Sequence, residues 1–160
     1  MHQDDLARLL EWRNHPSIRR YMYSRDEITP EQHQEWFEQS ENHPDKHLFI
    51  VESDSGPLGF VQFTMIRAEP VFDWGFYVIP GSPAGSGRRL GSAALHHAFS
   101  KLGAHKVCGQ AISDNSASLR FHEAMGFERE GRLREQYFDG SRYHDVVCFG
   151  LLKSEWATSQ

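Results

Sequence analysis

A glycine-rich segment carries the clearest chemical signal in this chain. Residues 80–99 read PGSPAGSGRRLGSAALHHAF, and they place Gly85, Gly87 and Gly91 with Arg88 and Arg89 where an apolar helical repeat begins. Glycine lets a backbone turn tightly and approach a ligand closely. The start of a helix offers N–H groups without partners and the positive end of the helix dipole. The segment therefore predicts a cradle for an anion, with phosphate or pyrophosphate favoured.

The chain ahead of this cradle is predicted to be helical and then to form strands. Residues 4–14 place apolar side chains on one helical face, and residues 15–24 form a short helix or turn. The segment 29–40 opens with a threonine cap, a proline and a glutamine at the capping-box position. Three strands with short links then indicate an antiparallel meander, at residues 47–53, 58–66 and 71–79.

Behind the cradle, helices and strands alternate. Residues 90–103 are predicted to form a helix, 106–112 a strand and 115–126 a second helix. The segments 127–138 and 142–152 read as a hairpin around an Asp-Gly turn. This order predicts an α/β fold, with a mixed sheet that has helices on its faces.

Composition limits the classes of protein. The chain has 160 residues, which predicts one domain over 1–160. A net charge of −5 argues against a nucleic-acid partner. No apolar run approaches the roughly 18 residues of a membrane span, and the acidic start shows no signal-peptide pattern. The only two cysteines, Cys108 and Cys148, are expected to be buried thiols, and the cytoplasm is the expected location.

Two kinds of phosphate cradle are disfavoured. A P-loop needs Gly-Lys-Ser/Thr at its end, whereas Gly87 is followed by two arginines. A dinucleotide site has a similar glycine spacing, and Asp114 lies at a suitable distance for its acidic residue. However, the strands before the loop are predicted to be antiparallel, and the second half of a doubly wound fold is absent.

A third kind of cradle fits two motifs in the right order. The run RRLGSA at 88–93 resembles the acetyl-coenzyme A loop of the GNAT superfamily of N-acetyltransferases, Gln/Arg-x-x-Gly-x-Gly/Ala; a second register starts at Ser86. The run NSASLRFHEAMGF at 115–127 resembles the superfamily's Asn-x-x-Ala-x-x-x-Tyr-x-x-x-Gly-Phe. His122 stands there where tyrosine is commonest.

This resemblance covers nearly the whole chain and implies a fold and a donor. It implies a mixed sheet with antiparallel N-terminal strands, a V-shaped splay at the acetyl-CoA site and flanking helices. The strand that usually precedes the first helix is expected to be missing, with self-association, a homodimer, as compensation. Acetyl-CoA is the expected acetyl donor, with no metal. Its implied binding residues are Phe76, Tyr77, Val78, Gly85, Gly87, Arg88, Arg89, Leu90, Gly91 and Asn115.

The head segment is similar to a narrower family. LEWRNHPSIRRYMYSRDEITPEQHQEWF resembles the enzymes that acetylate UDP-4-amino-4,6-dideoxy-N-acetyl-β-L-altrosamine in pseudaminic acid biosynthesis, as do WGFY and GRLRE further on. This resemblance implies direct acetyl transfer to the 4-amino group of a small nucleotide-sugar partner. The residues it assigns to that substrate are Arg13, Met22, Tyr23, His33 and Thr64.

Two residues are predicted to handle protons. An amine must be neutral to attack a thioester, so a base or a water relay has to take its proton. Asp73 on the central strand is the preferred base. The resemblance points to His122 as the proton donor to the leaving thiolate, because a neutral imidazole still has one N–H to give.

Purely structural explanations of these residues also stay open at this point. His122 is as well explained as a satisfied core or surface histidine, and Asn115 as a plain helix cap. Met22 and Tyr23 are also explained by ordinary packing between helices, and the two arginines by solvation. Asp73 is also explained by a surface ion pair, and the glycines of the loop by a plain turn between strand and helix. Two other functions also remain: an acetyltransferase for protein N-termini of the ribosomal-protein alanine type, and an acyl-CoA sensor without catalysis.

Overall fold

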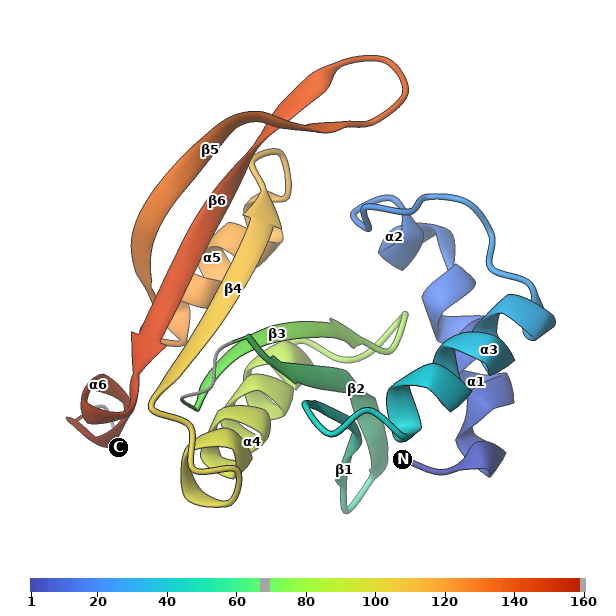
Figure 1. Cartoon of the computed structure of the whole chain (residues 1–160), viewed down its shortest axis with the longest axis horizontal. Helices are drawn as coiled ribbons and strands as arrows, with labels where there is room; N and C mark the ends of the chain where they lie inside the picture. Colours follow the sequence, from blue (N-terminus) through green and yellow to red (C-terminus); the bar gives the residue numbers. More distant parts are fainter. Residues whose placement is uncertain (67–69, 159–160) are drawn as a thin grey trace. The chain divides into compact units, whose positions relative to one another are not determined.

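The computed structural model of the chain describes residues 1–66 and 70–158 (Figure 1). Six strands form one mixed sheet in the order β1-β2-β3-β4-β6-β5, with helices between them, as the sequence predicts. The elements in chain order are η1 Gln3–Asp5, α1 Leu6–Asn14, α2 Pro16–Arg19, α3 Pro30–Glu41, β1 Lys46–Ser53, β2 Gly56–Met65, β3 Val71–Val78, α4 Ser86–Ser100, β4 Lys106–Ile112, α5 Ser116–Ala124, β5 Glu128–Phe138, β6 Tyr143–Leu152 and α6 Lys153–Thr158.

The chain divides into two compact units, which are described one at a time. The N-terminal unit comprises Met1–Thr64 and Gly75–Leu90. The C-terminal unit comprises Met65–Trp74 and Gly91–Gln160. Both β3 and α4 therefore contribute residues to each unit. The predictions of a single domain and of a homodimer stay predictions.

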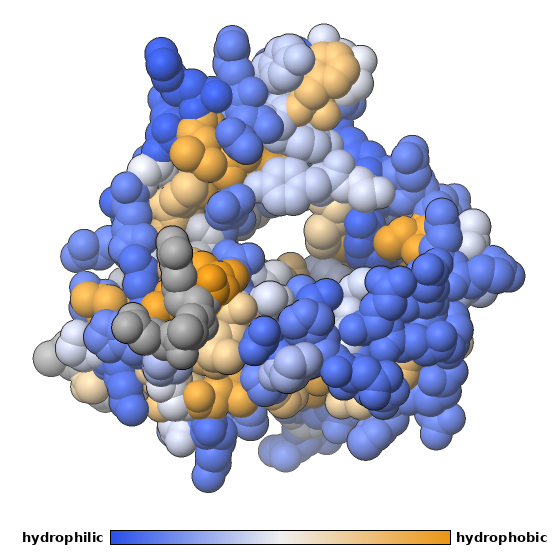
Figure 2. All heavy atoms as spheres, in the orientation of Figure 1, coloured by the Kyte–Doolittle hydropathy of each residue, from blue (hydrophilic) through white to orange (hydrophobic). Residues whose placement is uncertain are grey.

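The N-terminal unit packs helices α1–α3 with the hairpin of β1 and β2. The capping box of α3 forms as predicted: the Gln32 N–H donates to the Thr29 hydroxyl at 3.3 Å, and the Thr29 N–H donates to the Gln32 side chain at 2.9 Å. Leu9, Phe60 and Tyr77 form the centre of an apolar cluster. Figure 2 shows mostly hydrophilic side chains over the outward surfaces of α1 and α3, so these helices are amphipathic.

The C-terminal unit is built on the antiparallel strands β4, β6 and β5. The register of β4 with β6 runs from Lys106 opposite Leu152 to Ile112 opposite Val146. Helix α5 packs on one face of these strands (Figure 1), where Phe149 is only 1% exposed. β3 pairs with β4 in parallel over three residues, ending with Asp73 opposite Cys108. The predicted splay of these two strands beyond that point stays a prediction.

Three boundaries differ from, or were missed by, the sequence prediction. Helix α4 begins at Ser86 rather than at residue 90, because Gly85 adopts a φ of +89° and its carbonyl accepts from the Arg89 N–H to close the first turn. Helix α6 was not predicted. Its Glu155 carboxylate accepts from the Leu152 N–H at 2.8 Å, which starts the helix directly after β6. Ahead of α1 the structure describes only the short helix η1, and no strand.

Within residues 1–66 and 70–158 no helix has both the length and the apolar character that a membrane crossing requires. The two cysteines are free, as expected, but both are half-buried rather than fully buried. They lie on β4 and β6, on strands that pair with each other.

Candidate active site

The predicted anion cradle forms the turn between β3 and α4. The Ser82 hydroxyl donates to the Ile79 carbonyl at 2.7 Å, and the Ser86 N–H donates to the Pro83 carbonyl at 3.2 Å. Gly85 is exposed and has the positive φ that favours glycine. A helix leaves its first N–H groups without partners inside the helix. The turn therefore ends in backbone donors suited to a phosphate or pyrophosphate group.

The predicted loop residues after Gly85 belong to α4 and divide into two groups. Arg88 and Arg89 are exposed in the first turn, where cationic side chains are available to an anion. Leu90 is 0% exposed, so its side chain belongs to the core and not to a ligand surface. A Cβ at Gly91 would lie 2.7 Å from the Phe121 ring, which explains this glycine by the packing of α4 on α5. The half-buried Gly87 lies between Ser86 and the arginines.

The end of β3 supplies backbone groups rather than reactive side chains. The Tyr77 ring is 9% exposed and packs 5.4 Å from the Phe60 ring, and burial raises the pKa of its hydroxyl. Phe76 and Val78 are half-buried. Their contacts with the donor, which the backbone of this strand would make, stay predictions.

Arg13 and His33 lie close together in the N-terminal unit. One Arg13 nitrogen, Nη2, donates to the Ser24 carbonyl at 2.9 Å. The other, Nη1, is buried and has no hydrogen-bond partner among the described residues. His33 is 5% exposed and stacks on Trp36 at 5.1 Å; burial, followed by the Arg13 charge, lowers the pKa of its ring. A half-buried guanidinium with one buried, unpaired nitrogen, beside a neutral imidazole, suits an anionic or hydrogen-bond-accepting group.

The other predicted acceptor residues have different surroundings. Met22 packs against the cluster of Leu9, Phe60 and Tyr77. Tyr23 is 56% exposed. Thr64 lies near the end of β2, and its hydroxyl accepts from the Gln62 side chain at 3.2 Å. The structure thus brings Arg13, His33 and Met22 to one part of the N-terminal unit, while the roles of all five stay predictions.

Asp73 stands out among the carboxyl groups of the C-terminal unit. It lies on β3 directly opposite Cys108 of β4, where the parallel pairing ends. No hydrogen bond or ion pair joins its carboxyl to any other described residue. Burial raises the pKa of Asp73 to about 6. At neutral pH the carboxyl is therefore ionised and still basic enough to accept a proton from an ammonium group.

His122 has quite different surroundings. Its ring is 1% exposed and stacks 4.6 Å from the Phe149 ring. The Trp74 Nε1–H donates to His122 Nε2 at 3.3 Å, and because an indole only donates, the proton of the neutral imidazole must be on Nδ1. Nδ1 lies 2.8 Å from the Ser118 carbonyl and donates to it. Burial lowers the pKa of the ring, so both ring nitrogens serve the core in the neutral form.

Asn115 is the cap of α5. Its side-chain oxygen accepts from the Ser118 N–H at 3.1 Å, as expected for a cap. The predicted contact of Asn115 with the donor would therefore use the other atoms of this residue. Among the described residues no group of His, Cys, Asp and Glu has an arrangement that would hold a metal ion.

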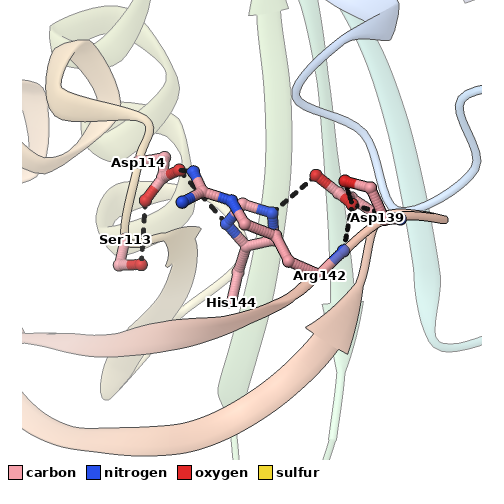
Figure 3. A network of polar contacts seen from close by, with 6 residues as sticks. Ser113, Asp114, Asp139, Arg142 and His144 are labelled. Carbon is pink, nitrogen blue, oxygen red and sulfur yellow. Dashed lines mark hydrogen bonds and ion pairs between the residues drawn. The ribbon is translucent and has the colours of Figure 1, made fainter.

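Sequence reasoning missed two features of the C-terminal unit. Gly109 is required by a close approach, since a Cβ there would lie 2.6 Å from His122 Nε2 and 2.7 Å from Trp74 Nε1. An isolated glycine inside an apolar strand was the available signal. The second feature is a polar network around His144 and Asp114, shown in Figure 3. In the sequence, Asp114 matches only the acidic residue of a dinucleotide site.

Comparison with known proteins identifies the family of this fold and site. A family model described as an acetyltransferase (GNAT) domain matches residues 1–128. An uncharacterized N-acetyltransferase of Bacillus subtilis, YokL, derived from the SPbeta prophage, is 31% identical over 126 residues, covering 76% of this chain and 70% of that protein. The chain therefore belongs to the GNAT acetyltransferases: it is an N-acetyltransferase, and its acetyl donor is acetyl-CoA.

Two further comparisons concern a polyamine enzyme. A spermidine N(1)-acetyltransferase of Vibrio cholerae is 27% identical over 135 residues, covering 76% of each chain. The crystal structure of the spermidine N-acetyltransferase from this organism in complex with CoA and spermine superposes with a TM-score of 0.90 at 23% identity, covering 98% of this chain and 95% of that one. This likeness confirms the predicted fold.

Proposed function

We propose that this N-acetyltransferase acts on the primary amine of a small molecule that also carries an anionic group. A UDP-linked 4-amino sugar of the pseudaminic acid type is the specific acceptor that the head segment favours. The observation that carries the catalytic part is Asp73, a carboxyl on the central strand without a partner among the described residues and with a pKa raised by burial to about 6.

Asp73 acts as the base. An acceptor amine enters as an ammonium ion, and Asp73 takes one proton so that the nitrogen lone pair can attack the acetyl carbonyl. The C–S bond of the thioester breaks as the N–C bond forms, and the products are an amide, a free thiol and one released proton. A pKa near 6 keeps the carboxyl ionised at neutral pH, while a normal aspartate pKa would make it a poorer proton acceptor.

The turn between β3 and α4 holds the donor. The first-turn N–H groups of α4 and the exposed Arg88 and Arg89 bind its pyrophosphate, because backbone donors and guanidinium groups both favour phosphate oxygens. The backbone of Phe76, Tyr77 and Val78 orients the donor along β3.

The anionic part of the acceptor is recognised by Arg13. Its buried Nη1 has no partner in the described chain, and a buried cationic nitrogen left unpaired costs stability unless a ligand completes it. His33 is kept neutral beside it and offers a hydrogen bond. Met22 and Tyr23 offer an apolar and an aromatic surface for a base, and Thr64 a hydroxyl.

His122 serves as a positioning residue of the core. Both of its ring nitrogens already have partners within the protein, so its proton goes to the Ser118 carbonyl and not to a thiolate. The leaving thiolate takes its proton from the acceptor nitrogen or from solvent.

Polyamines are the second candidate acceptors, favoured by the relative named as a spermidine N(1)-acetyltransferase. A polyamine is a multiple cation, and Arg13 would repel it. An N-terminal alanine peptide carries one ammonium group and tests the protein-acetylating alternative.

One assay separates these acceptors. Thiol release from acetyl-CoA is followed with the UDP-4-amino sugar, spermidine and an N-terminal alanine peptide in parallel. Turnover on the sugar, lost on Asp73→Asn substitution, supports the proposal. Turnover on spermidine or the peptide alone would discard the anionic acceptor, and acetyl-CoA binding without turnover on any of them would favour a sensor.

A further inference from the structure

Two buried side chains of the N-terminal unit carry polar atoms that the fold does not use. The His33 ring of α3 is 5% exposed, and the Tyr77 side chain of β3 is 9% exposed. Neither the His33 ring nor the Tyr77 hydroxyl forms a hydrogen bond with another described residue. A buried polar group without a partner costs free energy unless water or a ligand completes it. Both groups therefore need an explanation beyond the packing of this unit.

A series of four packed rings joins these two side chains. The His33 ring stacks 5.1 Å from the Trp36 ring, which meets the Phe60 ring edge-on at 6.0 Å. The Phe60 ring in turn lies 5.4 Å from the Tyr77 ring. Phe60 and Tyr77 belong to the buried apolar cluster of the unit, and Trp36 packs against that cluster. His33 and Tyr77 are thus the two ends of one continuous aromatic series.

The packing of Tyr77 does not require its hydroxyl. A phenylalanine ring would make the same contact with Phe60 and would bury no polar atom. Burial raises the pKa of the Tyr77 hydroxyl, so the group stays neutral and keeps a proton to donate. A ligand that accepts a hydrogen bond explains this hydroxyl better than the apolar cluster does.

Arg13 of α1 supplies a positive charge between the two groups. Its Nη1 is buried and has no partner in the described chain. After burial, the Arg13 charge is the next influence on the pKa of the His33 ring and on that of the Tyr77 hydroxyl, and it lowers both. The three groups therefore lie close together, yet no hydrogen bond joins any two of them. Arg19 adds a second positive charge beside Arg13, and no carboxylate of the described residues forms an ion pair with Arg13.

This set of groups suits a phosphate. It offers a guanidinium N–H, a phenol O–H and one imidazole N–H, because a neutral imidazole donates once. The donors come from α1, β3 and α3, so they approach a ligand from different directions. The oxygens of a phosphate also point in different directions, whereas the two oxygens of a carboxylate lie in one plane. Hydrogen bonds between a guanidinium and a phosphate are among the strong ones in proteins.

We propose that the Tyr77 hydroxyl determines specificity in the acceptor site by donating to a phosphate of the acceptor, beside Arg13 Nη1 and the His33 ring. These three groups are called the phosphate site. The inference rests on the proposed function in one respect, since it takes the acceptor to be the molecule that carries the phosphate. It gives the Tyr77 side chain a role of its own, separate from the predicted contact of its backbone with the donor.

Titration calorimetry with UDP and with uridine tests the phosphate site. CoA is present at saturation in each titration, so that it occupies the donor site and UDP cannot bind there. The unmodified protein should bind UDP roughly tenfold or more tightly than uridine, and Tyr77→Phe should lose roughly tenfold in UDP affinity but none in uridine affinity. A loss of this size corresponds to one hydrogen bond to a charged group. Tyr143→Phe removes the hydroxyl of an exposed tyrosine and is the matched control.

Arg13→Ala distinguishes this inference from the proposed function. Weaker UDP binding in Arg13→Ala, together with unchanged UDP binding in Tyr77→Phe, would overturn the role of Tyr77 and leave the proposed acceptor site in place. UDP binding that neither substitution weakens would overturn the phosphate site and the anionic acceptor together.

The unfolding midpoint without ligand shows whether the hydroxyl serves the fold instead. Tyr77→Phe should keep or raise this midpoint, because its hydroxyl has no partner in the described chain to lose. A lower midpoint, with equal losses of affinity for UDP and uridine, would overturn the inference.

Steady-state kinetics with the UDP-4-amino sugar give an independent readout. Tyr77→Phe should raise the KM for the sugar by roughly tenfold with little change in kcat, because the hydroxyl binds the phosphate equally in the ground and transition states. A fall in kcat at an unchanged KM would overturn the binding role, because the hydroxyl would then act in the transition state alone.

Discussion

The polar groups on the two faces of β3 differ in whether they have hydrogen-bond partners. Asp73 and Trp74 are consecutive residues of this strand, so their side chains point to opposite faces. On the Trp74 face, the indole N–H, the His122 ring and the Ser118 carbonyl satisfy one another inside an aromatic core. On the Asp73 face, a carboxyl with a raised pKa has no partner in the described chain.

This contrast underlies the proposal that Asp73 has a functional role and His122 a structural one. A satisfied buried group stabilises one packing, whereas an unsatisfied one costs free energy unless a ligand or a reaction uses it. Both residues were predicted to be catalytic, and their types alone did not distinguish them. Arg13 repeats the contrast within one side chain, because Nη2 has the Ser24 carbonyl and Nη1 has no partner in the described chain.

The largest expected effect comes from removing the unsatisfied carboxyl. Asp73→Asn should lower kcat by roughly 10²–10⁴-fold, the usual contribution of a general base. The same change should stabilise the fold. The pKa of Asp73 is raised in the folded state, so the unmodified protein loses stability as the pH rises from about 4 to about 6, and the amide has no charge to desolvate.

Thermal denaturation at neutral pH should therefore show a midpoint for Asp73→Asn that is higher by about 3 °C. The matched control is Asp54→Asn, which changes an exposed aspartate in the turn between β1 and β2 and should alter neither quantity. Full activity in Asp73→Asn would break the functional half of the comparison.

The second effect tests the half-paired guanidinium. Arg13→Ala should raise the KM for the UDP-4-amino sugar by roughly 10–100-fold with little change in kcat, because a charge-assisted contact to the substrate is lost in both ground and transition states. Steady-state kinetics measure this directly. Arg20→Ala, which removes an exposed arginine next to α2, is the control. An unchanged KM would remove Arg13 from the acceptor site.

The third effect should appear in stability rather than in chemistry. His122→Leu leaves the Trp74 N–H and the Ser118 carbonyl without partners, so we expect a loss of about 1–3 kcal/mol in the free energy of unfolding. Acetyl transfer at saturating substrates should stay within about threefold of the unmodified rate. His122→Asn keeps a donor for Ser118 and should recover part of the stability.

A proton-donor role for His122 would give the opposite pattern. The rate of His122→Leu would fall a hundredfold or more, on the order of a general-acid contribution, while the denaturation midpoint stayed in place. That outcome would remove the distinction between the two faces of β3.

The smallest effect concerns a well-formed but accessible ion pair. Lys106 Nζ lies 2.5 Å from the Glu130 carboxylate on the same sheet. Lys106→Met should change the free energy of unfolding by less than about 1 kcal/mol, because exposed pairs contribute little. Chemical denaturation measures it, and a loss several times larger would show that satisfied polar contacts in this unit cannot be ranked by burial.

The sequence predicted most of the helices and strands, but it did not predict which polar side chains have hydrogen-bond partners. Thr29 and Asn115 are caps, as their local sequence predicts. The six strands lie within about two residues of their predicted bounds. The start of α4 was placed late, since glycines and arginines gave no helical signal although Gly85 sets the turn.

The roles of the site residues were harder to predict, because they depend on contacts between residues that are far apart in the sequence. His122 and Trp74 are 48 residues apart, and no local pattern shows that they bond to each other. The same holds for Asp114 and His144. Conversely, Asp73 is the candidate base because its carboxyl has no partner among the described residues, and only the folded chain shows this.

The pH dependence of kcat, with acetyl-CoA and the amine acceptor both saturating, shows whether Asp73 is the base. We expect an acidic limb with a midpoint near the Asp73 pKa of about 6, present in the unmodified protein and absent from the residual activity of Asp73→Asn. An unchanged limb in Asp73→Asn would mean that the titrating base is another group and that Asp73 is not the base.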